Sequence, residues 1–215
     1  MKKKLILLVF FIIYSSFSQD YENKFVIYQD SIKKEFKQNG ITEYLFLSNN
    51  CPSNLAITKD GFKDININVN VFEAYLIWKK ETKIFMKKIS NNENFRIIYE
   101  SANFEIINFN PFKFIYKHKS KISNEKVLDN IINDNGEEIT FRMTLQCNTI
   151  FNIYLNSLYI ENYFVESNLI KSNYLSDDGK PYESEGLNMN YEFNNNLKMI
   201  RLFRKLNLEI AKIKF

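Results

Sequence analysis

The chain has 215 residues, with 29 Lys and Arg against 25 Asp and Glu and a formal net charge of +4. This length suits one domain with a substantial core, and 45% hydrophobic and 16% aromatic residues exclude an intrinsically disordered chain. Five Gly, two Cys and one His exclude a phosphate-binding glycine loop, a thiolate zinc cage and a His-rich metal site. We therefore expect no bound cofactor.

The first eighteen residues have the layout of a secretory signal peptide. Three lysines at residues 2–4 precede an apolar run over residues 5–14, and Ser16 and Ser18 supply the small residues before a cleavage site. The run is shorter than the roughly 20 residues of a membrane helix. We expect a secreted or periplasmic mature chain, residues 19–215, that forms a single domain without an integral membrane segment. Loss of the lysines lowers the net charge to +1, which disfavours nucleic acid as a partner.

The first half of the mature chain begins with a helical pattern. Aromatic and aliphatic residues recur at helical spacing over residues 20–38, and Gly40 stands where helices often end. A strand is predicted over residues 42–48, ended by a turn at residues 49–52, and a second short strand over residues 55–58.

The segment 65–79 reads as a strand that becomes apolar on both faces, which is typical of the middle of a covered sheet. A turn at residues 80–82 leads to a strand over residues 83–89, and a further strand is predicted over residues 95–100.

Asn110 and Pro111 are typical of a helix start, and the apolar residues that follow share one helical face as far as Ile122. Asp-Asn-Gly at residues 134–136 predicts a hairpin, followed by strict alternation over residues 139–147. Asn148-Thr149 and Asn156-Ser157 are predicted turns, and they precede strands near 150–155 and 158–165. These strands complete a predicted β-meander over residues 134–165.

The C-terminal part is predicted to contain a polar loop over residues 176–186, a strand over residues 187–193 and a helix over residues 197–213. Asn-rich tracts such as residues 194–196 are expected to be polar loops. The predicted fold class is α+β: an antiparallel sheet with a β-meander, flanked by an N-terminal, a central and a C-terminal helix.

The second half of the chain shows a recognisable order of motifs. Asn110-Pro111-Phe112 opens a Lys-rich helix, the Asp-Asn-Gly hairpin follows, and residues 188–191, Asn-Met-Asn-Tyr, precede a Leu- and Lys-rich terminal helix. Together with the Lys-rich signal peptide, this order resembles small secreted proteins of unknown function from AT-rich Bacteroidetes, over roughly residues 105–212. The resemblance implies an uncharacterised extracytoplasmic family and supplies no catalytic residues.

Two cysteines are the first candidates for chemistry. Export favours oxidation and an even count favours pairing, so a Cys51–Cys147 disulfide is a candidate, against a buried Cys147 and a free Cys51 thiol. A catalytic thiol would need a base, and the chain's one imidazole is His118, which lies among lysines on a predicted helix surface. We interpret His118 as part of a solvated face.

Basic and aromatic residues alternate around His118, a pattern that can bind polyanions. The simpler interpretation places the aromatic rings in the core and the lysines in solvent. The residues are Phe112, Lys113, Phe114, Tyr116, Lys117, Lys119 and Lys121.

Carboxylates cluster in the predicted loop over residues 176–186, where they suggest an irregular Ca²⁺ site or, with Glu137 and Glu138, a hydrolytic acid–base pair. An ordinary polar turn is the simpler interpretation. The loop carboxylates are Asp177, Asp178, Glu183 and Glu185.

Trp78 and Tyr75 lie on opposite faces of their predicted strand. They suggest an aromatic platform for sugars or peptides, although packing in a central strand explains both.

These patterns favour a non-enzymatic extracytoplasmic module that binds a protein or glycan partner through its sheet surface or loops. The alternative is a small extracytoplasmic hydrolase that uses paired carboxylates. A structural or inhibitor-like protein is a third possibility. We expect no enzymatic activity, because no nucleophile motif, metal constellation or nucleotide loop is present.

Overall fold

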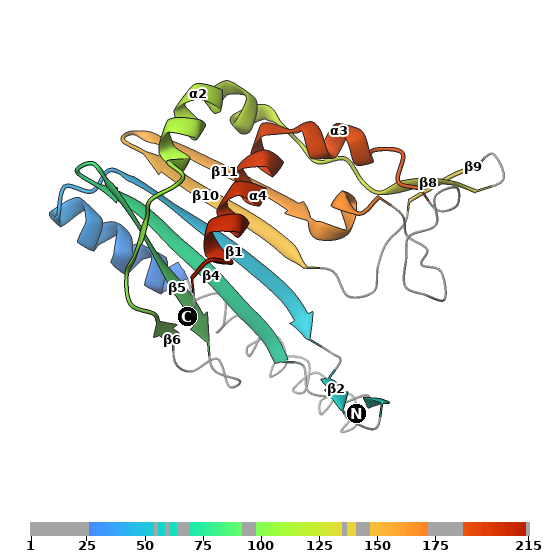
Figure 1. Cartoon of the computed structure of the whole chain (residues 1–215), viewed down its shortest axis with the longest axis horizontal. Helices are drawn as coiled ribbons and strands as arrows, with labels where there is room; N and C mark the ends of the chain where they lie inside the picture. The colour runs from blue at the N-terminus through green and yellow to red at the C-terminus, as the bar shows by residue number, and fades with distance from the viewer. Residues whose placement is uncertain are drawn as a thin grey trace, which may run out of the picture. The chain divides into compact units, whose positions relative to one another are not determined.

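Figure 1 shows the computed structural model of the chain, which describes residues 26–53, 56–58, 61–63, 69–91, 98–134, 137–140, 147–171 and 187–213. The chain divides after Thr42 into two compact units. The predicted signal peptide and the polar loop over residues 176–186 lie outside the described residues. No helix in the described ranges is long and apolar enough to cross a membrane.

The described part of the first unit is a helix over residues 26–38. Its end is set by Gly40, which adopts a φ of 68°, a conformation that glycine reaches without a steric penalty. The Ile41 amide then donates to the Phe36 carbonyl at 2.8 Å, as in a Schellman cap. The predicted helix and its stop are confirmed over these residues.

The second unit, Glu43–Phe215, is built on a seven-stranded antiparallel sheet. Six strands follow the order β11-β10-β1-β4-β5-β6, and β7 also pairs with β5. The strands are β1 (Glu43–Ser53), β4 (Val69–Lys80), β5 (Lys83–Asn91), β6 (Ile98–Glu100), β7 (Phe104–Ile106), β10 (Asn148–Leu155) and β11 (Leu158–Val165).

Helices α2 (Pro111–Asn124) and α4 (Lys198–Ile210) cover one face of this sheet (Figure 1). Alternate residues of the strands, such as Leu45, Ile77 and Ile153, form one buried cluster with apolar residues of both helices. The Asn110 side chain caps α2 by accepting from the Lys113 amide at 2.9 Å. The helix start predicted at residues 110 and 111 is therefore confirmed.

Smaller elements complete the second unit. Two separate hairpins are β2 (Ala56–Thr58) with β3 (Gly61–Lys63) and β8 (Ile131–Asp134) with β9 (Glu137–Thr140). A 3₁₀-helix, η1 (Glu166–Leu169), follows β11, and the short helix α3 (Tyr191–Asn196) precedes α4. The fold is α+β, with an antiparallel, meander-like sheet and helices in the N-terminal, central and C-terminal regions, as predicted.

The turn predicted at residues 49–52 is wrong, because β1 continues through it to Ser53. Asn49 is paired on both sides, with Glu73 of β4 and Thr149 of β10. Within the described residues, the pairing of β1 with β10 stops at Asn50, so Pro52 is paired with β4 alone, which suits a residue without a backbone N–H.

The predicted meander over residues 134–165 is only partly correct. Asn148 and Thr149 lie inside β10 rather than ending a strand. The β8–β9 hairpin forms its own two-stranded sheet, and Ile139, expected to face a core, is 42% exposed. Residues 141–146 lie outside the described residues. The β10–β11 hairpin itself is confirmed, with Asn156 at a φ of 52° in its turn.

The strand predicted over residues 187–193 is wrong, since α3 begins at Tyr191. The Asn188 side chain accepts from the Asn190 amide at 2.9 Å, which turns the backbone away from an extended path. Asn194, expected in a polar loop, is fully buried in α3. Strand β7 was not predicted.

Candidate functional site

A row of aromatic side chains crosses the sheet face opposite α2 and α4. The five residues come from five neighbouring strands, and each is paired directly with the following one in the register. Directly paired residues have side chains close enough to touch. The Tyr44 and Tyr154 rings stack at 4.5 Å, and the Trp78 and Phe85 rings stack at 5.6 Å. The row, from β5 to β11, is Phe85, Trp78, Tyr44, Tyr154 and Tyr159.

The row ends at an exposed surface on β11. Tyr159, Glu161 and Tyr163 alternate along the strand and so share one face. Tyr159 is 46% exposed and Tyr163 is 71% exposed. We call these three residues, with Asn152 of β10, the tyrosine face.

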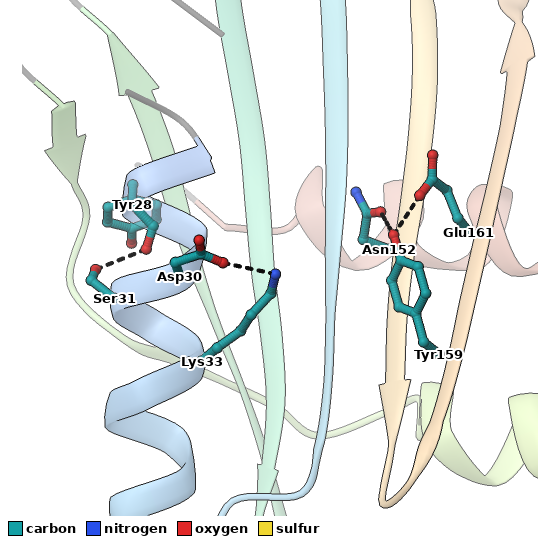
Figure 2. A network of polar contacts seen from close by, with 7 residues as sticks. All are labelled: Tyr28, Asp30, Ser31, Lys33, Asn152, Tyr159 and Glu161. Carbon is teal, nitrogen blue, oxygen red and sulfur yellow. Dashed lines mark hydrogen bonds and ion pairs between the residues drawn. The ribbon is translucent and has the colours of Figure 1, made fainter. Parts of the chain in front are cut away.

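Hydrogen bonds hold the tyrosine face together (Figure 2). The Tyr159 hydroxyl lies 2.6 Å from Asn152 Oδ1 and 2.5 Å from Glu161 Oε2. A phenol has one proton to donate, so these two acceptors share it. The Glu161 carboxylate only accepts and has lone pairs that Tyr159 does not fill, which suits a ligand that brings donors or a positive charge.

The electrostatics of Tyr159 point the same way. Burial raises the pKa of its phenol, and the hydrogen bond to Glu161 and the nearby carboxylate charge raise the pKa further. The phenol thus stays neutral near pH 7, and its ring lies beside a carboxylate where it can contact a cation.

A groove of about 410 Å³ lies next to the tyrosine face. One wall is formed by residues 161–165 of β11, and the other by residues 123–129, which end α2 and follow it. The Asn162 amide donates to the Ile122 and Glu125 carbonyls at 3.0 and 3.1 Å, which fixes the end of α2 against β11. The groove therefore has a defined position beside the edge of the sheet.

The carboxylates singled out in the sequence belong to the loop over residues 176–186 and to β9. Asp177, Asp178, Glu183 and Glu185 lie outside the described residues. Glu137 and Glu138 are exposed along β9. Within the described part of the chain, no group of three or more His, Cys, Asp or Glu side chains is arranged to hold a metal ion.

His118 lies at a kink in α2, where its ring contacts Phe114 at a centroid distance of 4.7 Å. Burial and the positive charges of Lys198, Lys117 and Lys121 lower its pKa. Phe112 is buried and Phe114 is half-buried, as expected of core rings. Tyr116 is 43% exposed, like the four lysines of this segment, so the expectation that its ring lies in the core is wrong.

The cysteines lie where the backbone favours a bond between them. Asn50 of β1 is opposite Asn148 of β10, and the next position outward places Cys51 opposite Cys147. Antiparallel partners are about 4.5–5.5 Å apart at Cα, within the range that disulfides span. No cysteine among the described side chains is free. The side chain of Cys51 is not described, so the Cys51–Cys147 bond stays a prediction.

Trp78 and Tyr75 are both buried, Trp78 in the aromatic row and Tyr75 in the core beneath the helices. The sequence interpretation named Trp78 but missed the tyrosine face. The available signal is the alternation of Tyr159, Glu161 and Tyr163 within the strand predicted near residues 158–165.

Comparison of the chain with protein-family models, with curated proteins and with solved structures found no match.

Proposed function

We propose that this protein is a non-enzymatic, extracytoplasmic binding module whose protein or glycan partner contacts the tyrosine face. The observation that carries the proposal is the exposed Tyr159–Glu161–Asn152 cluster, in which two acceptors compete for one phenol proton. Tyr163 adds a second exposed ring on the same face. Tyrosines with a polar tip and an apolar ring are enriched at binding surfaces for this reason.

The strand framework supports a rigid site of this kind. Tyr159 and Glu161 lie on one regular strand, and Asn152 lies opposite Glu161 on β10. A site held by paired strands keeps its geometry without a ligand, which lowers the entropic cost of binding.

The hydrolase alternative requires two carboxylates that face each other across a cleft. Glu125 lines the groove, but its Oε2 atom accepts from the Met199 amide at 2.9 Å and so caps α4. Glu161 accepts from Tyr159. These bonds favour a structural role for Glu125 and a binding role for Glu161.

The test is a screen of the purified chain against arrays of oligosaccharides and of synthetic peptides. We expect a ligand whose affinity falls about tenfold in the Tyr163→Ala and Glu161→Gln variants. Tyr99→Ala is the matched control, because Tyr99 is 52% exposed but lies on β6, at the other side of the sheet. An affinity that is unchanged in the Tyr163→Ala and Glu161→Gln variants, or conversion of the ligand to a product, would contradict the proposal.

A further inference from the structure

Strand β11 is a long edge of the seven-stranded sheet, and of its backbone amides that of Tyr163 already donates to Asn162 Oδ1 at 3.0 Å. Its eight residues pair with β10 alone within the described ranges. At the opposite edge of the sheet lie β6 and β7, which have three residues each. Edge strands carry backbone N–H and C=O groups that can pair with another extended chain, and short edge strands limit such pairing. β11 is thus the edge that offers a partner the longest run of backbone groups.

The groove supplies space beside this edge. It runs between β11 and residues 123–129, and its volume is about 410 Å³. Side chains of an added strand would alternate between the two faces of the sheet. One set would lie beside Tyr159, Glu161 and Tyr163, and the other set would enter the groove.

Charge identifies the chemistry of the added strand. Among the residues that the structure describes, the groove is lined by Glu125, Asp129 and Glu161 and by one cation, Lys126. The tyrosine face adds acceptors that lack a proton of their own. Lys and Arg side chains complement both surfaces, through charge-assisted hydrogen bonds to carboxylates and contacts with tyrosine rings.

The same charges disfavour a second copy of this chain as the occupant. Pairing β11 with itself in antiparallel fashion would bring acidic groove walls and the two Glu161 side chains toward each other. Like charges at close cross-strand positions destabilise a sheet.

We propose that β11 binds an extended, basic segment of a partner protein by strand addition, with its Lys or Arg side chains directed to Glu161 and Asp129. This inference rests on the proposed binding function and names its partner class. Main-chain hydrogen bonds supply affinity in this recognition mode, and alternate side chains supply specificity.

The experiment uses three synthetic peptides of about eight residues, the length of β11. One alternates Lys and Thr, the second alternates Glu and Thr, and the third is the Lys peptide with alternate backbone nitrogens methylated. We expect the Lys peptide to bind at least about tenfold more tightly than either of the others, because methylation removes the donors that strand pairing needs. Glu161→Gln and Asp129→Asn should each weaken it, and Glu192→Gln, an exposed change in α3, should not.

Each outcome separates the two proposals. Equal binding of the Lys and Glu peptides, or unimpaired binding of the methylated peptide, would overturn strand addition. Binding of an oligosaccharide that depends on Tyr163, with no peptide binding, would overturn this inference and leave the proposed function intact. If the binding of peptides and of oligosaccharides depends on neither Tyr163 nor Glu161, both the proposed function and this inference are wrong.

Discussion

Four buried asparagines join three irregular segments of the second unit. Asn130, Asn168, Asn188 and Asn194 are at most 7% exposed. Asn194 donates to the Leu128 and Asn168 carbonyls and accepts from the Leu128 amide, each at 2.9 Å. Asn188 donates to the Asn168 and Ile170 carbonyls. These side chains satisfy backbone groups that no helix or strand pairs.

We predict that Asn194→Ala lowers the free energy of unfolding by about 2–3 kcal/mol, because it leaves the amide and the carbonyl of Leu128 without their Asn194 partner and removes one of the two donors to the Asn168 carbonyl. The measurement is urea unfolding followed by the fluorescence of Trp78, the chain's single tryptophan, which is buried. Asn196→Ala, an exposed change in the same helix, should cost less than about 0.5 kcal/mol. Equal effects of the two substitutions would contradict a structural role for the network.

Glu43 begins β1 and ties the sheet to α2. Its carboxylate lies 2.8 Å from Lys79 Nζ, and it accepts from the Tyr116 hydroxyl at 2.7 Å. Partial burial raises the pKa of Glu43, but the bonds from Lys79 and Tyr116 outweigh it, so the pKa lies below the ordinary value of 4.5. Burial and the Glu43 carboxylate in turn raise the pKa of Tyr116 to about 12.

A carboxylate whose pKa is lowered in the folded state stabilises the fold above its unfolded pKa, and that contribution is lost as the pH falls through the folded pKa. We predict that Glu43→Gln costs about 1–2 kcal/mol at pH 7 and that the difference shrinks below pH 4.5. Glu105→Gln is the control, since its ion pair with Lys83 is exposed and contributes little. A Glu43→Gln cost that does not change with pH would contradict this account.

At the scale of elements, the sequence predicts those helix ends, turns and helix faces that depend on residues close together in the chain. The Asn110 cap, the turn after β10 and the apolar face of α4 depend on neighbours in sequence, and each was predicted correctly. The length of β1 and the turn before α3 depend on distant partners. Asn49 stays extended because β4 and β10 pair with it, and this pairing has no local signature.

The candidate site was predictable to a similar extent. The alternation of Tyr159, Glu161 and Tyr163 placed them on one strand face, but the identity of β11 as the sheet edge depends on the strand order. The groove also depends on how α2 ends against β11, which Asn162 fixes through contacts about 40 residues away in sequence.

The pairing of β1 with β10 supports the predicted disulfide between Cys51 and Cys147. Because this register, continued by one residue past Asn50 and Asn148, would place residue 51 opposite residue 147, we expect the purified chain to gain about 2 Da on reduction. Closure of a loop of about 97 residues would stabilise the fold by roughly 4–5 kcal/mol by the chain-entropy estimate, so reduction should lower the urea midpoint. The Cys51→Ser variant should show neither effect of the reductant. An unchanged mass in the parent chain would exclude the bond.

At the scale of the whole second unit, one face of the sheet forms the core and β11 is an edge strand. Helices α2 and α4 cover the face that includes Leu45 and Ile153. The aromatic row on the other face leads to the tyrosine face at β11, beside the groove. On our proposal, the helix-covered face supplies stability and the β11 edge supplies binding.

Hydrogen–deuterium exchange of the chain, with and without the tightest ligand from the two arrays, tests this central claim most directly. We predict that the ligand slows amide exchange in residues 158–165 and 123–129 and is recovered chemically unchanged. Protection confined to β6 and β7, with none on β11, or recovery of a cleaved ligand, would contradict a binding module that acts through its β11 edge.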